Sequence, residues 1–261
     1  MKREIVNIVL LGSGNVATHL GLHLQNIGYN IIQVYSRTEK NAMILANRLN
    51  TDYTSDPEQL NQQADLYLIA AKDDSIATIA SFNILKNKFL VHTAGSVRSD
   101  IFIPYTDKYG VLYPFQTFTK TREVNFKIVP VLVEANTPDL ENELITLAEK
   151  LSEKVLKASS DQRAMLHISA VFACNFTNHM YAIAADLLKN NDLSFDLLQP
   201  LIMETAEKVM SIRPADAQTG PAVRFDRNIM DQQMTKLNEV PVYQEIYRIM
   251  SESIQNLQNK K

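Results

Sequence analysis

Two patterns of hydrophobic and polar positions follow one another along the chain. Up to about residue 158, short apolar, often β-branched runs alternate with amphipathic stretches, which is typical of βαβ units. This pattern predicts strands over residues 5–11, 31–35, 66–70, 89–92, 111–113 and 128–133. Continuous apolar runs such as Ile8 to Leu11 are typical of strands covered on both faces. The fold class predicted is therefore α/β, with a Rossmann-type, doubly wound and mainly parallel sheet.

From residue 159 onward the pattern changes to long stretches with helical periodicity. Ser159 begins a Ser-Ser-Asp sequence that can cap a helix, and six of the seven glycines lie before this point. The periodicity predicts helices over about 161–190, 195–211, 223–237 and 243–257, separated in the later part by prolines. We expect an α/β domain over residues 1–158 and a separate all-helical domain over residues 159–261.

Composition narrows the classes of function. The 26 basic and 29 acidic residues give a formal charge of −3, so no broad basic surface is expected for a nucleic acid. Cys174 is the single cysteine, which excludes an internal disulfide framework and a multi-thiolate zinc site. No apolar run reaches the roughly 18 residues that a membrane span needs. We expect a cytoplasmic protein that binds no metal, nucleic acid or membrane.

The first predicted strand leads into a glycine-rich turn. Gly12, Gly14 and Ala17 match the G-x-G-x-x-G/A fingerprint between a strand and a helix, with Ser13, Asn15 and Val16 between them. The fingerprint requires a tight first turn, close approach of the backbone to a pyrophosphate, and a small residue where the helix packs on the strand. This context predicts a dinucleotide site; the alternative interpretation is a purely structural turn.

The end of the second predicted strand indicates which dinucleotide is bound. The strand runs into Ser36, Arg37 and Thr38, and no acidic residue precedes Glu39 to accept the ribose hydroxyls of NAD. Two hydroxyls and a planar guanidinium suit a 2′-phosphate, which favours NADP. The alternative is that Arg37 is one more solvated surface cation.

Ligands of a doubly wound sheet bind outside the carboxyl ends of its strands. The residues expected there are small or polar and follow three further strands: Ala70, Ala71, Lys72, Thr93, Ala94, Gly95 and Gln116. We assign Gln116 to the substrate and the others to the cofactor. The alternative interpretation of Lys72 is that it is simply exposed. The alternative for the nearby His92 is that it is a core residue. The apolar segment 113–118 either packs against the helical domain or lines a substrate pocket.

Polar side chains interrupt the apolar face of the long predicted helix. At about 100° per residue, His167, Asn175, Asn178 and His179 share one face. Hydride transfer to C=O or C=N requires a proton source, so His167, Asn175 and Asn178 are candidate catalytic residues and His179 a candidate substrate ligand. The alternative is an internal hydrogen-bond network at a helix or subunit interface.

A turn with the only glycine of the second half, Gly220, supplies two more candidates. Thr219 and Arg224 are assigned to the substrate. The guanidinium of Arg224 can bind a carboxylate through two hydrogen bonds. The alternatives are a structural Gly-Pro turn, and pairing of Arg224 with Asp226 or Glu204.

Nearly the whole chain resembles a bacterial family of putative NADP oxidoreductases, which joins a Rossmann-like domain to a helical domain of unknown function. The resemblance rests on five stretches: residues 12–17, 92–96, 113–118, 167–179 and 218–221. More distantly, the chain is similar to pyrroline-5-carboxylate reductase, the β-hydroxyacid dehydrogenases and the deazaflavin-dependent NADP reductases. It departs from the hydroxyacid dehydrogenases in having Val171, not lysine, four residues before Asn175, so His167 is the candidate proton donor here. The resemblance implies a homodimer formed through the helical domain.

The function expected from these features is NADP(H)-dependent hydride transfer between the nicotinamide and a small carbonyl or imine substrate. The alternative is a non-catalytic NADP(H) sensor or a dimeric scaffold.

Overall fold

The computed structural model describes residues 5–259. Those residues form two compact units, which divide between Val171 and Phe172 and are considered separately below. Helix α5 (Ser160–Ala170) starts where the sequence predicts a cap and belongs to the first unit. The boundary expected near residue 158 stays a prediction, since it depends on the unit to which this helix is assigned.

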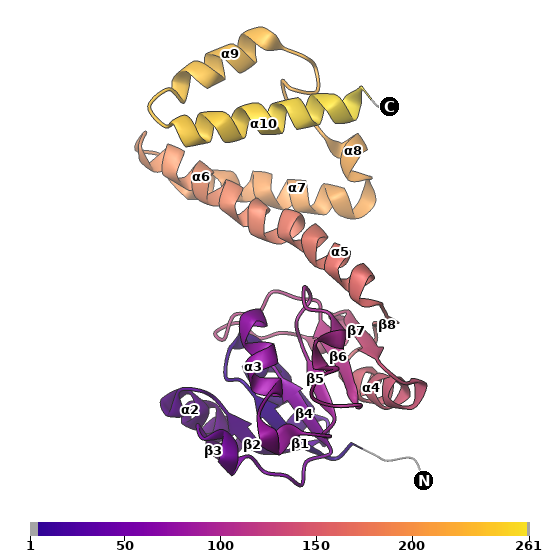
Figure 1. Ribbon diagram of the computed structural model, residues 1–261. Coiled ribbons are helices and arrows are strands. Elements are labelled where there is room, and N and C mark those ends of the chain that lie inside the picture. The colour runs from indigo at the N-terminus through magenta and orange to yellow at the C-terminus, as the bar shows by residue number, and fades with distance from the viewer. Residues whose placement is uncertain (1–4, 260–261) are drawn as a thin grey trace. The chain divides into compact units, whose positions relative to one another are not determined.

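The first unit contains an eight-stranded sheet with the order β3-β2-β1-β4-β5-β6-β7-β8 (Figure 1). Its strands are β1 (Asn7–Leu11), β2 (Asn30–Tyr35), β3 (Asp52–Thr54), β4 (Leu66–Ile69), β5 (Leu90–His92), β6 (Tyr109–Pro114), β7 (Val131–Ala135) and β8 (Val155–Lys157). Only the pairing of β6 with β7 is antiparallel. The predicted α/β class with a doubly wound, mainly parallel sheet is therefore confirmed.

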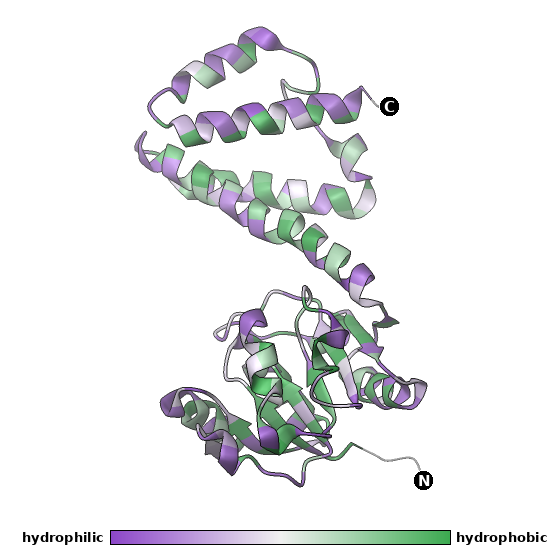
Figure 2. Ribbon diagram, viewed as in Figure 1, coloured by the Kyte–Doolittle hydropathy of each residue, from purple (hydrophilic) through white to green (hydrophobic). Residues whose placement is uncertain are grey.

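Hydrophobic side chains cover both faces of this sheet. Along β1, Ile8 and Leu10 belong to one core cluster, whereas Val9 and Leu11 belong to the other. All four are fully buried, as a continuous apolar run between two helical layers requires. The same concentration of apolar residues is visible in the strands of Figure 2. The helices of this unit are α1 (Asn15–Asn26), α2 (Glu39–Leu49), α3 (Ile76–Ala80), α4 (Pro138–Leu151) and α5.

The sequence does not predict two of the strands, and a third strand begins later in the chain than predicted. β3 and β8 have three residues each and lie at the two edges of the sheet, where little apolar surface is needed. The strand predicted from residue 128 begins at Val131, because Asn125 caps a short 3-10 turn, η5 (Phe126–Ile128).

The second unit is helical. Its elements are α6 (Thr177–Lys189), η7 (Phe195–Leu198), α7 (Gln199–Ser211), α8 (Pro214–Ala217), α9 (Arg227–Lys236) and α10 (Pro241–Gln258). The helix predicted from residue 223 starts later, because the carboxylate of Asp226 accepts a hydrogen bond from the Ile229 amide and caps α9. None of the helices in residues 5–259 has both the length and the apolar composition that crossing a membrane requires.

The long helix predicted over residues 161–190 is present but not uniformly α-helical. Between α5 and α6, the six residues of η6 (Val171–Phe176) are π-helical. A π-helical turn inserts extra chain, so later residues lose the α-helical register of those before it. The common face expected for His167, Asn175, Asn178 and His179 assumed uninterrupted α-helical winding, and that assumption is wrong.

Candidate functional site

A groove of about 910 Å³ lies in the first unit at the carboxyl ends of the parallel strands. Every predicted cofactor residue lines it, together with Gln116 and His167. These residues are Gly12, Ser13, Gly14, Asn15, Val16, Ser36, Arg37, Thr38, Ala70, Ala71, Lys72, Thr93, Ala94 and Gly95. Segments far apart in the sequence thus meet at one sheet edge, although their individual roles remain predictions.

The glycine turn has the backbone geometry that its fingerprint requires. Gly12 has φ of +134°, and a Cβ atom there would lie 2.2 Å from the carbonyl oxygen of Ala70. Its amide donates to the carbonyl of Tyr35 over 2.8 Å, which ties the turn to β2. Gly14 is the N-cap of α1, and a Cβ atom there would meet nothing within 4 Å. Gly12 is therefore needed to form the turn, whereas Gly14 leaves open space beside the amino end of α1.

The residues after β2 lie beside this turn. The Ser13 hydroxyl donates to the Ser36 hydroxyl over 2.9 Å, joining the two segments. Arg37 is exposed, lines the groove and forms no ion pair among residues 5–259. Its guanidinium is available for an anion at this end of the groove.

Tyr113 and His167 form a hydrogen-bonded pair in the wall of the groove. The Tyr113 hydroxyl lies 3.0 Å from Nδ1 of His167. Burial raises the pKa of the Tyr113 phenol, the positive charge of Arg163 acts in the opposite direction, and Asp73 adds to the increase. A Cβ atom on Gly95 would lie 2.7 Å from both side chains. The pair therefore fits only because position 95 is glycine.

Sequence reasoning missed Tyr113 as an individual site residue. The sequence indicates only the apolar segment 113–118 as a whole, of which Tyr113, Pro114 and Gln116 line the groove. Its position at the carboxyl end of β6, next to an expected binding edge, was the available signal.

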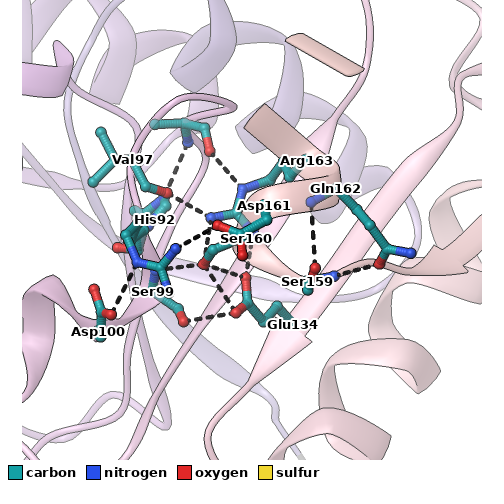
Figure 3. Close-up of polar contacts among 12 residues, drawn as sticks. His92, Val97, Ser99, Asp100, Glu134, Ser159, Ser160, Asp161, Gln162 and Arg163 are labelled. Carbon is teal, nitrogen blue, oxygen red and sulfur yellow. Dashed lines mark hydrogen bonds and ion pairs between the residues drawn. The ribbon is translucent and has the colours of Figure 1, made fainter. Parts of the chain in front are cut away.

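A buried ion pair supports the loop after β5 (Figure 3). Arg163 is 1% exposed and pairs with Glu134, while Ser99 and Ser160 donate hydrogen bonds to the same carboxylate. The Arg163 guanidinium also donates to the carbonyl oxygens of Ala94, over 3.2 Å, and Val97, over 2.5 Å. Arg163 thus fixes the backbone around Gly95. No local pattern in the sequence indicates this role, because a basic residue on an amphipathic helix is ordinarily solvated.

His92 is a core residue. Its side chain is fully buried, Nδ1 accepts a hydrogen bond from the Ala94 amide, and Nε2 lies 3.4 Å from the Arg98 carbonyl oxygen. Burial, reinforced by the charge of Arg163, lowers the pKa of His92 to about 4. Of the two interpretations left open for His92, the core interpretation is correct.

Five predicted site residues lie in the second unit, beyond the part of the chain that forms the groove. Asn175 is in the π-helical segment, and Asn178 and His179 are in the first turn of α6; all three are exposed. Thr219 lines a separate, apolar cavity of about 320 Å³. Arg224 is exposed in the turn before α9. Their catalytic and substrate-binding roles stay predictions.

Neither of the ion pairs considered for Arg224 is present within the described residues. Asp226 caps α9, and Glu204 instead lies 3.7 Å from the ammonium of Lys208.

Both parts of the chain match known protein families. Residues 7–95 match the family described as "NADP oxidoreductase coenzyme F420-dependent", and residues 129–254 match a domain of unknown function, DUF2520. A crystal structure from Bacteroides fragilis, described as a putative NADP oxidoreductase, is 44% identical, with a TM-score of 0.91 over 97% of this chain and 98% of that one. The chain belongs to the same family as this putative NADP oxidoreductase.

Two more distant structures with the same fold are described as reductases. An imine reductase from Myxococcus stipitatus, solved with NADP⁺, is 14% identical, with a TM-score of 0.66 over 96% of this chain and 93% of that one. A pyrroline-5-carboxylate reductase from Coxiella burnetii is 16% identical, with a TM-score of 0.55 over 98% of each chain. At these identities the similarity shows the fold alone. A search of curated protein sequences gives no match.

Proposed function

We propose that the chain is an NADP(H)-dependent oxidoreductase of a small carbonyl or imine compound. The observation that carries this proposal is that the glycine turn and the Tyr113–His167 pair line one groove at the carboxyl edge of the sheet. A nucleotide site and a proton-transferring pair in the same groove are the two components that such a reaction needs.

The groove fits a dinucleotide phosphate. The open space at Gly14 lets a pyrophosphate approach the backbone, and the amino end of α1 favours an anion there. The hydroxyls of Ser36 and Thr38 and the guanidinium of Arg37 can hold the 2′-phosphate that distinguishes NADP from NAD. Membership of the family of the putative NADP oxidoreductase from Bacteroides fragilis supports this choice of cofactor.

The bound nicotinamide would supply or accept the hydride. The residues of this chain would handle the proton that accompanies it. With its pKa raised by burial, the Tyr113 phenol stays protonated at neutral pH and can donate to a substrate oxygen or nitrogen. Nδ1 of His167, in hydrogen-bond contact with the phenol oxygen, can return a proton to it. The loop around Gly95, held by Arg163, leaves room for both side chains.

Replacement of His167 tests the catalytic part of this proposal. In His167→Ala, we expect turnover with NADPH to fall by about 100-fold or more, because general acid–base groups contribute that much. NADPH affinity should stay within about threefold of the parent, since no phosphate ligand is removed. The assay follows loss of reduced nicotinamide across a panel of small aldehydes, 2-oxo acids and cyclic imines. Tyr113→Phe, which keeps the ring and removes only the hydroxyl, is the matched second variant.

Two results would contradict the catalytic role. Turnover undiminished in both variants would remove the pair from the reaction. A parent protein that binds NADPH but oxidises it with no member of the panel would favour the sensor alternative.

We also propose that a second copy of this chain covers the helical unit. Within residues 172–259, only Ala222 and Ser251 are buried, each with 6% of its surface exposed, whereas Phe172, Leu197, Met210 and Val242 are between 65% and 87% exposed. Apolar surface on this scale is typical of an interaction face. Sedimentation equilibrium should give twice the mass of the chain; a monomer at micromolar concentration would contradict the dimer.

A further inference from the structure

The chain after β6 folds back against the start of α1. Two side chains of α1 hold it there by hydrogen bonds to backbone carbonyls. The Asn15 amide donates to the Phe118 carbonyl oxygen over 2.8 Å, and His19 Nε2 donates to the Thr119 carbonyl oxygen over 2.9 Å. We call residues 115–122 the strap. The strap is thus tied to the helix that starts at the glycine turn.

The strap is also packed. The Phe118 ring lies 5.4 Å from the His19 ring and stacks on Phe126 at 5.7 Å, measured between ring centroids. Phe126 is 2% exposed and belongs to the hydrophobic core, and Phe118 packs against the same cluster. An aromatic anchor beside two hydrogen bonds gives the strap a defined position over the amino end of α1.

This position brings Lys120 to the glycine turn. Its ammonium donates to the Ser13 carbonyl oxygen over 3.0 Å, and Lys120 lines the groove together with Gly12, Gly14 and Asn15. An ammonium has three N–H donors, and this contact uses one of them. Among the described residues, Lys120 has no carboxylate partner. A positive charge with two further donors therefore lies where the turn leaves open space.

The charged side chains that line the groove come from different segments of the chain. The cations are Arg37, Lys72 and Lys120, and the acids are Asp73 and Asp74. Arg37 follows β2, and Lys72 directly precedes Asp73 and Asp74 in the chain after β4. Lys120 is the cation of this set that directly contacts the glycine turn.

We propose that Lys120 binds the pyrophosphate of the dinucleotide and that Gln116 and Lys120, the strap residues that line the groove, form the second wall of that site. This inference rests on the proposed NADP(H) function and adds a binding residue to it. The Asn15 side chain then acts as a positioning group for the strap, because its amide is engaged with Phe118. Lys120 and Arg37 should therefore bind different parts of the cofactor: Lys120 binds the pyrophosphate, and Arg37 binds the 2′-phosphate.

Two ligand fragments separate these contributions. ADP-ribose carries the pyrophosphate without a 2′-phosphate, and adenosine 2′-monophosphate carries the 2′-phosphate without a pyrophosphate. In Lys120→Gln, we expect NADPH, NADH and ADP-ribose to bind about 10- to 100-fold more weakly, the range for loss of a charge-assisted hydrogen bond. Binding of adenosine 2′-monophosphate should stay within about twofold. In Arg37→Gln, adenosine 2′-monophosphate should bind more weakly, whereas the affinity for ADP-ribose should stay within about twofold.

The strap offers a matched control for the loss of charge. Arg122 is exposed, lies two residues from Lys120 and does not line the groove. Arg122→Gln therefore removes the same charge from the same segment and should leave all four affinities unchanged. The affinities are measured by calorimetric titration of the full chain, with the fragment affinities obtained by competition against NADPH.

The outcomes distinguish this inference from the proposed function. If the parent binds NADPH and Lys120→Gln binds it equally well, the role of Lys120 is overturned and the proposed function stands. Equal weakening by Lys120→Gln and Arg122→Gln would show only a general effect of charge and would also overturn it. If the parent binds neither NADPH nor NADH, the proposed function fails, and this inference fails with it.

Discussion

Arg163 shows how one buried charge can organise a site that it does not line. A fully buried guanidinium is tolerated only when it is paired and its donors are satisfied. Arg163 meets this condition through Glu134 and through the Ala94 and Val97 carbonyls, which belong to the loop after β5 (Figure 3). The ion pair therefore links α5, β7 and the groove wall.

Loss of this guanidinium should be costly. In Arg163→Met, the Glu134 carboxylate loses its counter-charge and two carbonyls lose their donor, so we expect a loss of about 3–5 kcal/mol in the free energy of unfolding. Urea denaturation followed by circular dichroism measures it. Arg98→Met, at an exposed surface ion pair, is the control and should cost less than about 1 kcal/mol. Similar values for the two variants would contradict the role of Arg163.

His92 should make stability depend on pH. The native pKa of about 4 lies below the ordinary value of 6.5, so the native protein holds fewer protons than the unfolded chain between these values. The contribution of His92 is therefore fully present above pH 6.5 and is lost as the pH falls toward 4. The loss should reach about 3 kcal/mol at most.

The test compares unfolding free energies of the parent protein and His92→Gln across this pH range. The carboxylates of the protein also titrate at the acidic end, so the difference between the two curves carries the information. We expect the difference to change between pH 6.5 and 4 and to be constant above it. Parallel curves throughout would contradict a neutral, buried His92.

At the scale of elements, the turn between β1 and α1 has two glycines with separable purposes. Gly12→Ala should destabilise the fold, because a Cβ atom would clash with the Ala70 carbonyl at a positive φ. Gly14→Ala meets no protein atom within 4 Å, so we expect unfolding free energy within about 0.5 kcal/mol of the parent. Its added methyl group should nevertheless weaken NADPH binding at least about tenfold, by occupying the space for the pyrophosphate.

Thermal unfolding and calorimetric titration of the two variants separate these effects. A Gly14→Ala protein that binds NADPH like the parent would contradict the placement of the pyrophosphate at this turn.

The parts of the site that could be predicted from sequence are those made by local patterns. Residues 12–17 and 36–38 each follow an apolar strand. Because ligands bind at the carboxyl ends of such strands, the sequence predicts that these residues line one site, and they do line one groove. Lys120 and Arg163 could not be found this way. Lys120 contacts Ser13, 107 positions away, because the strap folds back onto the glycine turn. Arg163 contacts Glu134, 29 positions away, because α5 packs against β7.

The elements that escaped prediction had weak or absent local signals. β3 and β8 are three residues long, too short for an alternating pattern to be recognised. The π-helical segment Val171–Phe176 contains neither glycine nor proline, which are the usual indicators of an irregular helix. An assumed α-helical winding therefore placed Asn178 and His179 on the wrong register relative to His167.

At the scale of the whole molecule, the two units differ in how they bury apolar surface. The first unit has a hydrophobic core on each face of its sheet, and the groove lies at the edge of this packed sheet. The helical unit leaves large apolar side chains exposed, consistent with the proposed cover by a second copy. All the residues proposed to hold the dinucleotide lie in the first unit, so cofactor binding tests the account without knowledge of the substrate.

The most direct test is calorimetric titration of the full chain with NADPH and, separately, with NADH, repeated for Arg37→Ala. We predict micromolar binding of NADPH and a clear preference over NADH. In Arg37→Ala, NADPH should bind about 10- to 150-fold more weakly while NADH is little changed, because a charge-assisted contact to the 2′-phosphate is lost. Binding of neither dinucleotide, or equal weakening of both by the substitution, would contradict the assignment of this groove to NADP(H).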